Sequence, residues 1–241
     1  MEDGGFSAEL VGKRVESRGV KTFSFSLDEG YEYVSGQFAF LEFFFEGRRY
    51  MKHFTISSSP TREYREFTTI ISDSDYKQAL DKLGIGSRVE LSGPMGVFTL
   101  DSRVSDRIAF LAGGIGVTPV RSMLWYLADT GLMEELEIKL FYSNRNLERI
   151  VFRDELEELS EKIDGLEVVH TLTDLSMVEE KGWVGETGYI NRKMLGRYLE
   201  DLGRYTFYVV GPPAFNRAMG EMLDKAGVER ESIIGEDFSG Y

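Results

Sequence analysis

The apolar residues change their rhythm near the middle of the chain, and this change constrains the fold more than any other feature. Up to about Leu100 they form short runs and alternating stretches typical of β-strands, separated by glycine-rich turns. After Asp106, strand-like runs alternate with stretches of helical length. The sequence therefore predicts two domains: an antiparallel β-barrel over residues 1–103, followed by an α/β domain with a parallel sheet over residues 104–241.

The first domain is predicted to contain short strands and one helix. Closure of such strands into a barrel is favoured because it removes exposed strand edges. The predicted strands are residues 22–27, 38–45, 67–71 and 88–91, the predicted turns are residues 28–30, 35–36, 46–47, 84–86 and 93–94, and the predicted helix is residues 75–83.

The second domain is predicted to alternate strands and helices, which is typical of a parallel sheet covered on both faces. The predicted strands are residues 107–112, 136–142, 166–172 and 205–210, and the predicted helices are residues 117–128, 152–159, 191–199 and 214–226. The polar boundary between the domains is short, so we expect them to pack closely.

Composition excludes several classes of function. The net charge of −13 disfavours binding to nucleic acid, which depends on basic residues. The absence of cysteine excludes thiolate catalysis and cysteine-ligated zinc or iron–sulfur centres. No apolar run approaches the ~20 residues of a membrane-spanning helix, and the start does not resemble a signal peptide. We expect a cytoplasmic protein without a membrane partner, and any redox function would need an organic cofactor.

One segment combines a buried strand, a glycine turn and the start of a helix. The turn contains Gly113, Gly114 and Gly116. Thr118 is expected near the helix cap and Pro119 in the first turn. Glycines let the backbone approach a pyrophosphate, and the helix N-terminus offers free N–H donors. Pro119 stands in place of the third glycine of the usual pattern, so nucleotide binding and an ordinary tight turn remain equally open.

A second segment, residues 52–60, places a cation, an aromatic ring and several hydroxyls within a few positions. Lys52 could offset phosphate charge, Phe54 could stack on a flat ring, and hydroxyls such as that of Thr55 could bond ring heteroatoms. The alternative is a β-strand with alternate residues exposed to solvent, and that alternative is favoured if the segment is taken alone.

Two more segments lie in the second domain. A strand ends at Gly211 and Pro212, at the edge where parallel sheets bind ligands. The last seven residues include Glu236, Phe238 and Tyr241. Because chain ends are usually polar, this aromatic end either docks into the protein or is loose.

These four pieces, in this order, resemble the ferredoxin–NADP reductase superfamily over nearly the whole chain. The resemblance implies FAD as cofactor, with FMN as the alternative, and NADH or NADPH as cosubstrate. The flavin contacts that it implies are Lys52, His53, Phe54, Thr55, Ile70, Lys77, Gly93, Pro94 and Gly96. The coenzyme contacts that it implies are Gly113, Gly114, Gly116, Thr118, Pro119, Arg145, Asp174, Gly211 and Pro212.

The resemblance also implies roles for single residues. Thr55 would face flavin N5, where the hydride arrives, and Phe54 would pack on the flavin. Lys52 falls where the family has an arginine, so it keeps the charge but loses the bidentate contact with phosphate. Val210 occupies the position of a cysteine that many members carry close to the path of the hydride. We interpret this difference as an adjustment of the hydride-transfer site rather than a loss of activity.

The end of the chain resembles family tails in which an aromatic ring covers the flavin until nicotinamide displaces it. Phe238 is the first candidate and Tyr241 the second, with Glu236 as a proton or hydrogen-bond partner. Arg145 could pair with the 2′-phosphate of NADPH, whereas the carboxylate of Asp174 would repel it. This balance favours NADH.

The predicted function is a reductase that passes a hydride from NAD(P)H to FAD and electrons on to an external acceptor, such as ferredoxin or a partner subunit. One alternative is a noncatalytic or electron-transfer subunit of a larger redox complex. Another is a nucleotide-binding sensor.

Overall fold

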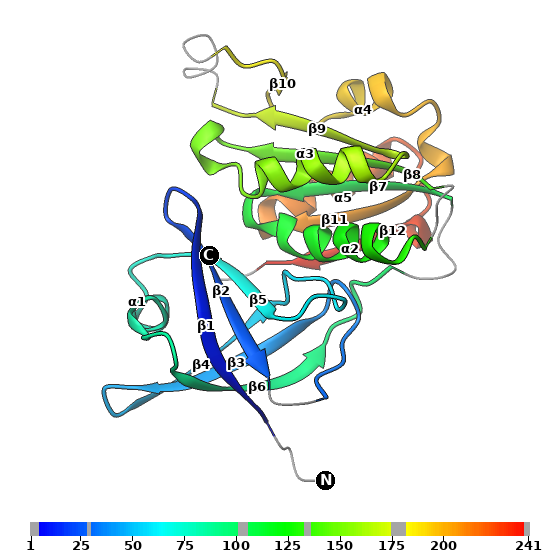
Figure 1. The fold of residues 1–241 in the computed structure, drawn as a ribbon. Helices are drawn as coiled ribbons and strands as arrows, with labels where there is room; N and C mark the ends of the chain where they lie inside the picture. Colours follow the sequence, from blue (N-terminus) through cyan, green and yellow to red (C-terminus); the bar gives the residue numbers. More distant parts are fainter. Residues whose placement is uncertain (1–4, 28–29, 101–105, 133–135, 175–181, 239–241) are drawn as a thin grey trace.

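Two six-stranded sheets of different kinds build the protein. The computed structural model describes residues 5–27, 30–100, 106–132, 136–174 and 182–238. The antiparallel sheet lies below the parallel one in Figure 1, and the described strands of the first sheet all precede those of the second along the chain. The predicted domain boundary between residues 103 and 104 lies outside the described residues, and so does Tyr241.

The first sheet is an antiparallel barrel, as predicted. Its spatial order is β4-β3-β6-β1-β2-β5, and its two edges approach each other at a bridge between Ile56 and Phe67. The helix α1 packs on it through Tyr76, whose hydroxyl donates to the carbonyl of Leu41 at 2.9 Å. The elements are β1 (Phe6–Ser17), β2 (Val20–Leu27), β3 (Phe38–Phe45), β4 (Arg48–Thr55), β5 (Arg65–Ile70), α1 (Asp75–Lys82) and β6 (Arg88–Met95).

The second sheet is parallel throughout, with the order β10-β9-β8-β7-β11-β12. Helices cover both of its faces, so the predicted α/β class is confirmed. The strands are β7 (Arg107–Gly113), β8 (Glu137–Asn144), β9 (Leu166–Leu172), β10 (Glu186–Thr187), β11 (Thr206–Gly211) and β12 (Ile233–Asp237). The helices are α2 (Val117–Thr130), α3 (Arg153–Lys162), α4 (Arg192–Tyr198) and α5 (Pro213–Lys225).

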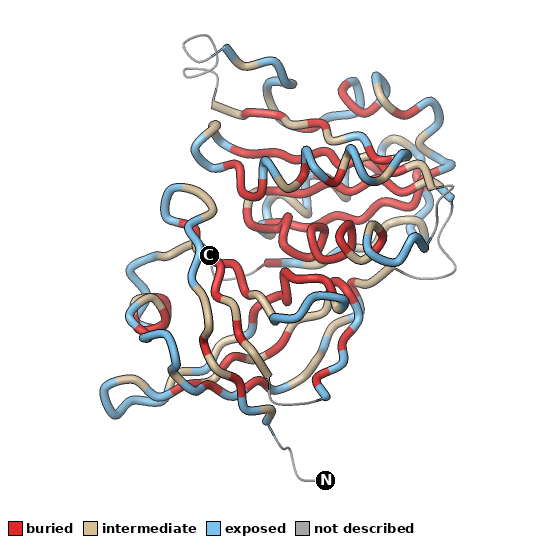
Figure 2. The backbone as a smooth tube through the Cα atoms, viewed as in Figure 1, coloured by how far each residue is buried: buried red, intermediate tan, exposed pale blue. Residues whose placement is uncertain are grey.

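Three apolar clusters form the core. One fills the barrel, and the other two lie on opposite faces of the parallel sheet. Figure 2 shows buried segments running through both sheets, with exposed residues mainly in loops and on outer helix faces. In the part of the chain that the structure describes, no helix is long and apolar enough to span a bilayer.

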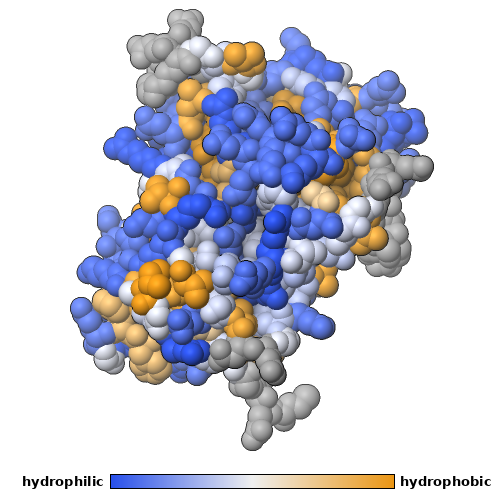
Figure 3. Space-filling view, viewed as in Figure 1, coloured by the Kyte–Doolittle hydropathy of each residue, from blue (hydrophilic) through white to orange (hydrophobic). Residues whose placement is uncertain are grey.

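The two domains meet along a seam between the barrel and the helices α2 and α3 (Figure 1). Hydrophilic side chains gather along this seam on the face shown in Figure 3. Apolar contacts lie deeper, where the Phe98 ring meets the Tyr208 ring edge-on at 5.5 Å. The Tyr208 hydroxyl also donates to the carbonyl of Thr99 at 3.2 Å. The described end of the first domain, at Phe98 and Thr99, is therefore packed against β11.

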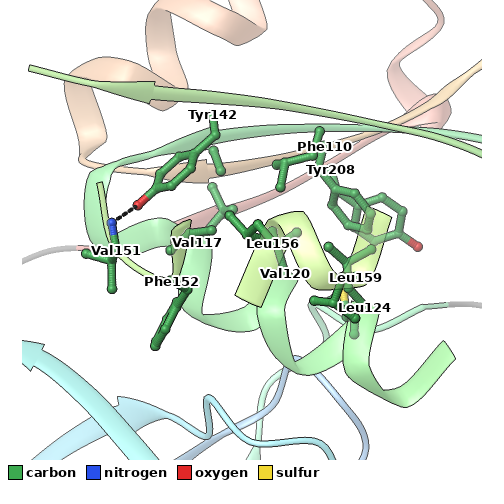
Figure 4. Packing of buried hydrophobic residues seen from close by; sticks show 14 of the residues in the cluster. Phe110, Val117, Val120, Leu124, Tyr142, Val151, Phe152, Leu156, Leu159 and Tyr208 are labelled. Carbon is green, nitrogen blue, oxygen red and sulfur yellow. Dashed lines mark hydrogen bonds between the residues drawn. The ribbon is translucent and has the colours of Figure 1, made fainter. Parts of the chain in front are cut away.

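Helix α2 buries an apolar face on the sheet (Figure 4). Val117, Val120 and Leu124 recur at helical spacing and are fully buried. Behind them the Tyr142 hydroxyl accepts a hydrogen bond from the backbone N–H of Val151 at 3.2 Å. This packing fixes the start of α2, and therefore the turn before it, to the sheet.

One local prediction was wrong. The Gly93–Pro94 turn lies inside β6, where the register with β3 shifts between Phe38 and Phe40. It is therefore an irregularity within a strand, and Gly93 has a φ of +125° that suits glycine. Thr118 and Pro119 lie as predicted, near the cap and in the first turn of α2, and Gly116 occupies the cap position itself.

Candidate active site

The strand order of the parallel sheet reverses between β7 and β11. From β7 the chain adds β8 and β9 on one side, and it later places β11 and β12 on the other. β7 ends at Gly113 and β11 at Gly211, with Ala112 in register with Val210. Ligands of open parallel sheets bind at the carboxyl ends of the strands at such a reversal. This edge is therefore the first candidate for a nucleotide site.

Three of the predicted glycines lie where the ends of these strands touch. A Cβ on Gly116 would lie 2.6 Å from the carbonyl oxygen of Val210. A Cβ on Gly211 would lie 2.9 Å from the Phe215 ring, and one on Gly113 would meet the same ring at 3.0 Å. The close packing of the strand ends thus requires these glycines, whatever binds beside them.

Gly114 differs because it faces open space. Its φ is +55°, and a Cβ there would meet nothing within 4 Å. It lines a cavity of about 420 Å³ that takes residues from both domains. The predicted site residues on its wall are Ile70, Gly113, Gly114, Arg145 and Pro212, and residues that the sequence did not single out include Val20, Ser143, Asn144 and Tyr189.

The barrel reaches this cavity through a pair of strand neighbours. Val20 of β2 stands in register with Ile70 at the end of β5, and both line the cavity. Thr118 and Pro119, by contrast, are buried in the first turn of α2 and do not line it. The Thr118 hydroxyl donates to the carbonyl of Ile115 at 3.1 Å. Thr118 and Pro119 therefore support the glycine turn from the buried start of α2 and do not form the cavity wall.

A smaller cavity of about 100 Å³ lies between the barrel and the end of the chain. His53, Thr55 and Phe38 line it from the barrel, and Glu236 and Phe238 line it from β12 and the residue that follows. Phe38 was not predicted as a site residue. The sequence feature that could have identified Phe38 is its place at the start of the aromatic strand, which puts it in register with Thr55.

Phe54 lies mostly inside the barrel. Its side chain is 1% exposed, and its ring lies 5.5 Å from that of Tyr76. Neighbouring strand residues point to opposite faces, so Thr55 turns toward the small cavity, but Phe54 also reaches the wall of this cavity. The contact of Phe54 with flavin stays a prediction.

Glu236 brings a carboxyl group to this cavity without a compensating partner. Its Oε2 atom is buried and has no hydrogen-bond partner among the described residues. Burial raises the pKa of Glu236 to about 7, because the charged form loses its hydration. Gly96 stands beside it, since a Cβ there would lie 3.8 Å from Oε1 of Glu236. A buried carboxyl that titrates near neutrality can hold or release a proton.

Residues 236–238, the described tail, line the smaller cavity and contact β11 beside the larger one. The backbone N–H of Phe238 donates to the carbonyl of Gly211 at 3.0 Å, and the Phe238 side chain is 8% exposed. Pro212, the next residue along from Gly211, lines the larger cavity while Phe238 lines the smaller one. The Asn216 amide also donates to the carbonyl of Glu236 and to the Asp237 carboxylate, both at 2.6 Å. Of the two predicted tail aromatics, Phe238 is therefore docked.

Two lysines lie together on the barrel. Lys77 of α1 is 1% exposed, and Lys52 of β4 is half-buried. Burial and, to a lesser extent, the charge of Lys52 together lower the pKa of Lys77 to about 8. A flat, phosphorylated ligand such as a flavin nucleotide fits this set of groups. The two lysines could offset phosphate charge, and the aromatic rings, the Thr55 hydroxyl and the unbonded oxygen of Glu236 could contact a ring system.

Arg145 and Asp174 pair with each other at the mouth of the larger cavity. Arg145 Nε lies 3.5 Å from Asp174 Oδ2, and the backbone N–H of Asp174 donates to the carbonyl of Arg145 at 2.9 Å. The cation that could meet a 2′-phosphate is thus held beside a carboxylate.

Two family models match the two domains. The model of the oxidoreductase FAD-binding domain matches residues 7–100, and that of the oxidoreductase NAD-binding domain matches residues 110–221. The first covers the barrel with its lysine pair. The second covers the parallel sheet from β7 to α5 with its glycine turn.

Two curated relatives match nearly the full chain. The glycine betaine monooxygenase reductase subunit of Pseudomonas aeruginosa is 30% identical over 228 residues, which are 92% of this chain and 61% of the relative. The stachydrine N-demethylase reductase subunit of Rhizobium meliloti is 30% identical over 241 residues, covering 96% of this chain and 66% of the relative. The chain thus spans about three fifths to two thirds of the length of these relatives.

A solved structure has the same fold. The ferredoxin NADP⁺ reductase of Neisseria gonorrhoeae, crystallised with FAD and NADP, matches with a TM-score of 0.80 and 18% identity. The match covers 96% of this chain and 97% of that one.

Proposed function

This chain belongs to the ferredoxin–NADP reductase superfamily, with an FAD-binding domain followed by an NAD-binding domain, and from this premise we propose that it is an NADH-dependent reductase serving a separate electron acceptor. The observation that carries the proposal is that both cavities lie at the carboxyl ends of β11 and β12, where Phe238, which lines the smaller cavity, bonds to Gly211, the residue before Pro212 on the wall of the larger cavity. One presents Thr55 and Glu236, and the other presents the open Gly114.

We propose that the barrel residues hold FAD rather than FMN. Thr55, His53 and Glu236 would hold the ring system, and Lys52 and Lys77 would offset the phosphate charge. Gly93, Pro94 and Gly96 would shape the wall between β6 and β3. When bound, FAD supplies hydride acceptance and the delivery of electrons singly or in pairs.

The small cavity of about 100 Å³ is smaller than a flavin ring system, and Phe238 forms one of its walls. Withdrawal of the Phe238 ring would enlarge it and join it to the coenzyme cavity. We therefore propose that Phe238 occupies the nicotinamide position until the coenzyme arrives. Glu236 then holds a proton at its buried carboxyl group while the two domains exclude water.

NADH is the proposed coenzyme because the Asp174 carboxylate already neutralises Arg145. A 2′-phosphate would have to break that pair and meet the negative charge of Asp174. The ribose hydroxyl of NADH carries no charge and meets no such repulsion.

The acceptor is proposed to be a partner protein. The chain itself has no cysteine to ligate an iron–sulfur cluster, and its relatives are named as reductase subunits of a monooxygenase and an N-demethylase. An oxygenase component and a ferredoxin are the two candidates. Ferredoxin and the cytoplasmic location stay predictions.

The deciding experiment is an anaerobic titration of the purified, FAD-loaded protein with NADH. Bleaching of the visible flavin absorbance at one NADH per flavin is the expected result. A protein that takes up neither FAD nor FMN, or a flavoprotein that NADH does not bleach, would instead favour a noncatalytic subunit or a nucleotide-binding sensor.

A further inference from the structure

The seam between the domains contains a buried arginine that the reductase chemistry does not use directly. Arg121 lies on α2, and only 7% of its side chain is exposed. Its guanidinium contacts both domains. Within the barrel, Nη1 donates to the carbonyl of Ser57 and to the carboxylate of Glu66, both at 2.8 Å. Arg121 is thus held from the barrel side by one backbone group and one charge.

These barrel partners adjoin Thr55. Ser57 follows Thr55 by two residues, and its backbone N–H donates to the carbonyl of Glu66 at 2.8 Å. The pair continues the bridge between Ile56 and Phe67 that closes the barrel. A group that fixes Ser57 and Glu66 therefore also fixes the end of β4, where the Thr55 hydroxyl lies.

The partners in the second domain complete the enclosure. Arg121 Nε lies 2.6 Å from Glu155 on α3, and the guanidinium stacks 4.5 Å from the centroid of the Phe152 ring. Phe152 has a φ of +59°, unusual for a bulky residue. Glu155 also accepts a hydrogen bond from the Trp125 indole at 3.0 Å.

A second arginine shares the carboxylates of this cluster. Arg14 lies 3.5 Å from Glu66 within its own domain, 2.8 Å from Glu16, and reaches across the seam to Glu155 at 3.2 Å, so two guanidiniums face three carboxylates. Burial, the largest single effect, would raise the pKa of Glu155, but the charge and hydrogen bonds of Arg121, the hydrogen bond from Trp125 and the charge of Arg14 together hold that pKa below its usual value. Removing the charge of Arg121 would leave three carboxylates facing the one guanidinium of Arg14, which is costly.

Arg121 also lies one helical turn from the nucleotide side. Helix α2 begins at Val117, directly after the glycine turn, and Arg121 follows four residues later. Because a helix moves as a rigid unit over one turn, a side chain anchored at Arg121 sets the position of that turn relative to Thr55. The neighbouring Ser122 hydroxyl supports it by donating to the carbonyl of Ser58.

We propose that Arg121 is a positioning residue for hydride transfer, holding the nucleotide turn of one domain in register with the Thr55 segment of the other. The inference rests on the proposed reductase function. Its physical basis is the steep dependence of transfer rate on geometry, in which a misplacement of ~1 Å can cost ~100-fold.

The test compares Arg121→Gln with wild type by anaerobic stopped-flow mixing of the FAD-loaded protein with NADH. We expect the rate constant of flavin reduction at saturating NADH to fall about tenfold, while the Kd for NADH changes by less than about threefold. With NADH deuterated at C4, both proteins should show an isotope effect, which identifies hydride transfer as the step that slows. Arg121→Lys should recover part of the rate.

A matched control is Arg62→Gln. Arg62 also spans the seam to α2, where it pairs with Asp129 at 2.8 Å, but at the far end of the helix. The Arg62→Gln variant should leave the rate constant of flavin reduction unchanged. Hydrogen exchange on the flavin-free proteins adds a second readout, because Arg121→Gln should raise exchange at residues 56–59 and 117–122 together.

If Arg121→Gln does not fold, Glu66→Gln removes only the charge on the barrel side and should lower the same rate in the same direction. Failure of wild type to be reduced by NADH would contradict the proposed function. Reduction of wild type together with unchanged rates in Glu66→Gln and in any folded Arg121→Gln would overturn the role of Arg121 alone.

Discussion

At the scale of single residues, Thr55 places a hydroxyl group on a cavity wall while its neighbour Phe54 enters the core. Thr55→Val keeps the branched shape and removes the hydroxyl. We expect slower flavin reduction with nearly unchanged NADH affinity, because the lost contact matters mostly during transfer. Stopped-flow rates will measure this, with Thr187→Val, an exposed position on β10, as control. Wild-type rates in Thr55→Val would remove Thr55 from the site.

Glu236 makes stability depend on pH. Its pKa is raised by burial from 4.5 to about 7, so the folded protein binds more protons than the unfolded chain between these values. The stabilising contribution is complete below pH 4.5 and is lost as the pH rises to about 7. Burial also lowers the pKa of His170 from 6.5 to about 4, which adds stability as the pH rises over much of the same range. The contribution of Glu236 is therefore the difference between wild type and Glu236→Gln in urea unfolding, and the stability of wild type relative to Glu236→Gln should fall as the pH rises.

The control for this prediction is a neutral side chain. Glu236→Gln should remove the downward contribution in that window, whereas Glu229→Gln, at an exposed position, should leave the pH dependence as in wild type. Parallel profiles for wild type and Glu236→Gln would mean that the Glu236 carboxyl is hydrated.

Asp174 governs the proposed choice of coenzyme through its pair with Arg145. Asp174→Arg should raise the ratio of kcat/KM for NADPH to that for NADH by about tenfold. The 2′-phosphate of NADPH would lose its repulsion by a carboxylate and gain attraction to a guanidinium, each worth up to ~1 kcal/mol at an exposed site. Asp174→Asn should give a smaller change in the same direction. An unchanged ratio would contradict the preference for NADH.

At the scale of elements, the long periodic segments could be predicted from the sequence. Residues 166–172 were predicted as a strand and form β9, and the helix predicted over residues 117–128 extends to residue 130 in α2. The twelve-residue β1 could not be delimited, because its register with β2 shifts near Gly12 and again near Ser17. Each shift breaks the alternation that marks a strand.

Only part of the candidate site could be predicted from the sequence. The glycine turns at strand ends could be predicted, because the pattern that identifies them lies within one short segment. Phe38 and Arg121 were not, because their roles arise from contacts between segments far apart in the chain. An arginine in the second turn of an otherwise apolar helix was the available signal for the seam.

The tail is the element whose removal should change binding most. Deleting the residues after Asp237 removes the Phe238 ring, whose packing is worth about 0.5–1.5 kcal/mol. We expect tighter coenzyme binding, faster flavin release and weaker discrimination between NADH and NADPH, because the ring competes for the nicotinamide position. Coenzyme Kd and flavin release rates measure these effects. If none changes, Phe238 does not belong to the site.

At the scale of the whole molecule, cofactor binding and folding are linked. FAD at a hundredfold excess over its Kd should stabilise the protein by about 2.7 kcal/mol, which corresponds to a rise in Tm of about 5–10 °C for a chain of this size. Thermal unfolding with FAD, FMN and riboflavin separates the phosphate contribution from that of the ring. Equal shifts for riboflavin and FAD would contradict a phosphate role for Lys52 and Lys77.

The contact of Trp125 with the seam has a spectroscopic consequence. The chain has only two tryptophans. Trp125 lies under the Arg62 guanidinium at 4.2 Å and bonds to Glu155, whereas Trp183 lies beside His170 near the far edge of the parallel sheet. The emission of Trp125 is thus sensitive to any opening between the domains, and Trp183→Phe would leave it as the sole tryptophan. The protein therefore carries its own fluorescent reporter of domain separation, readable without a label.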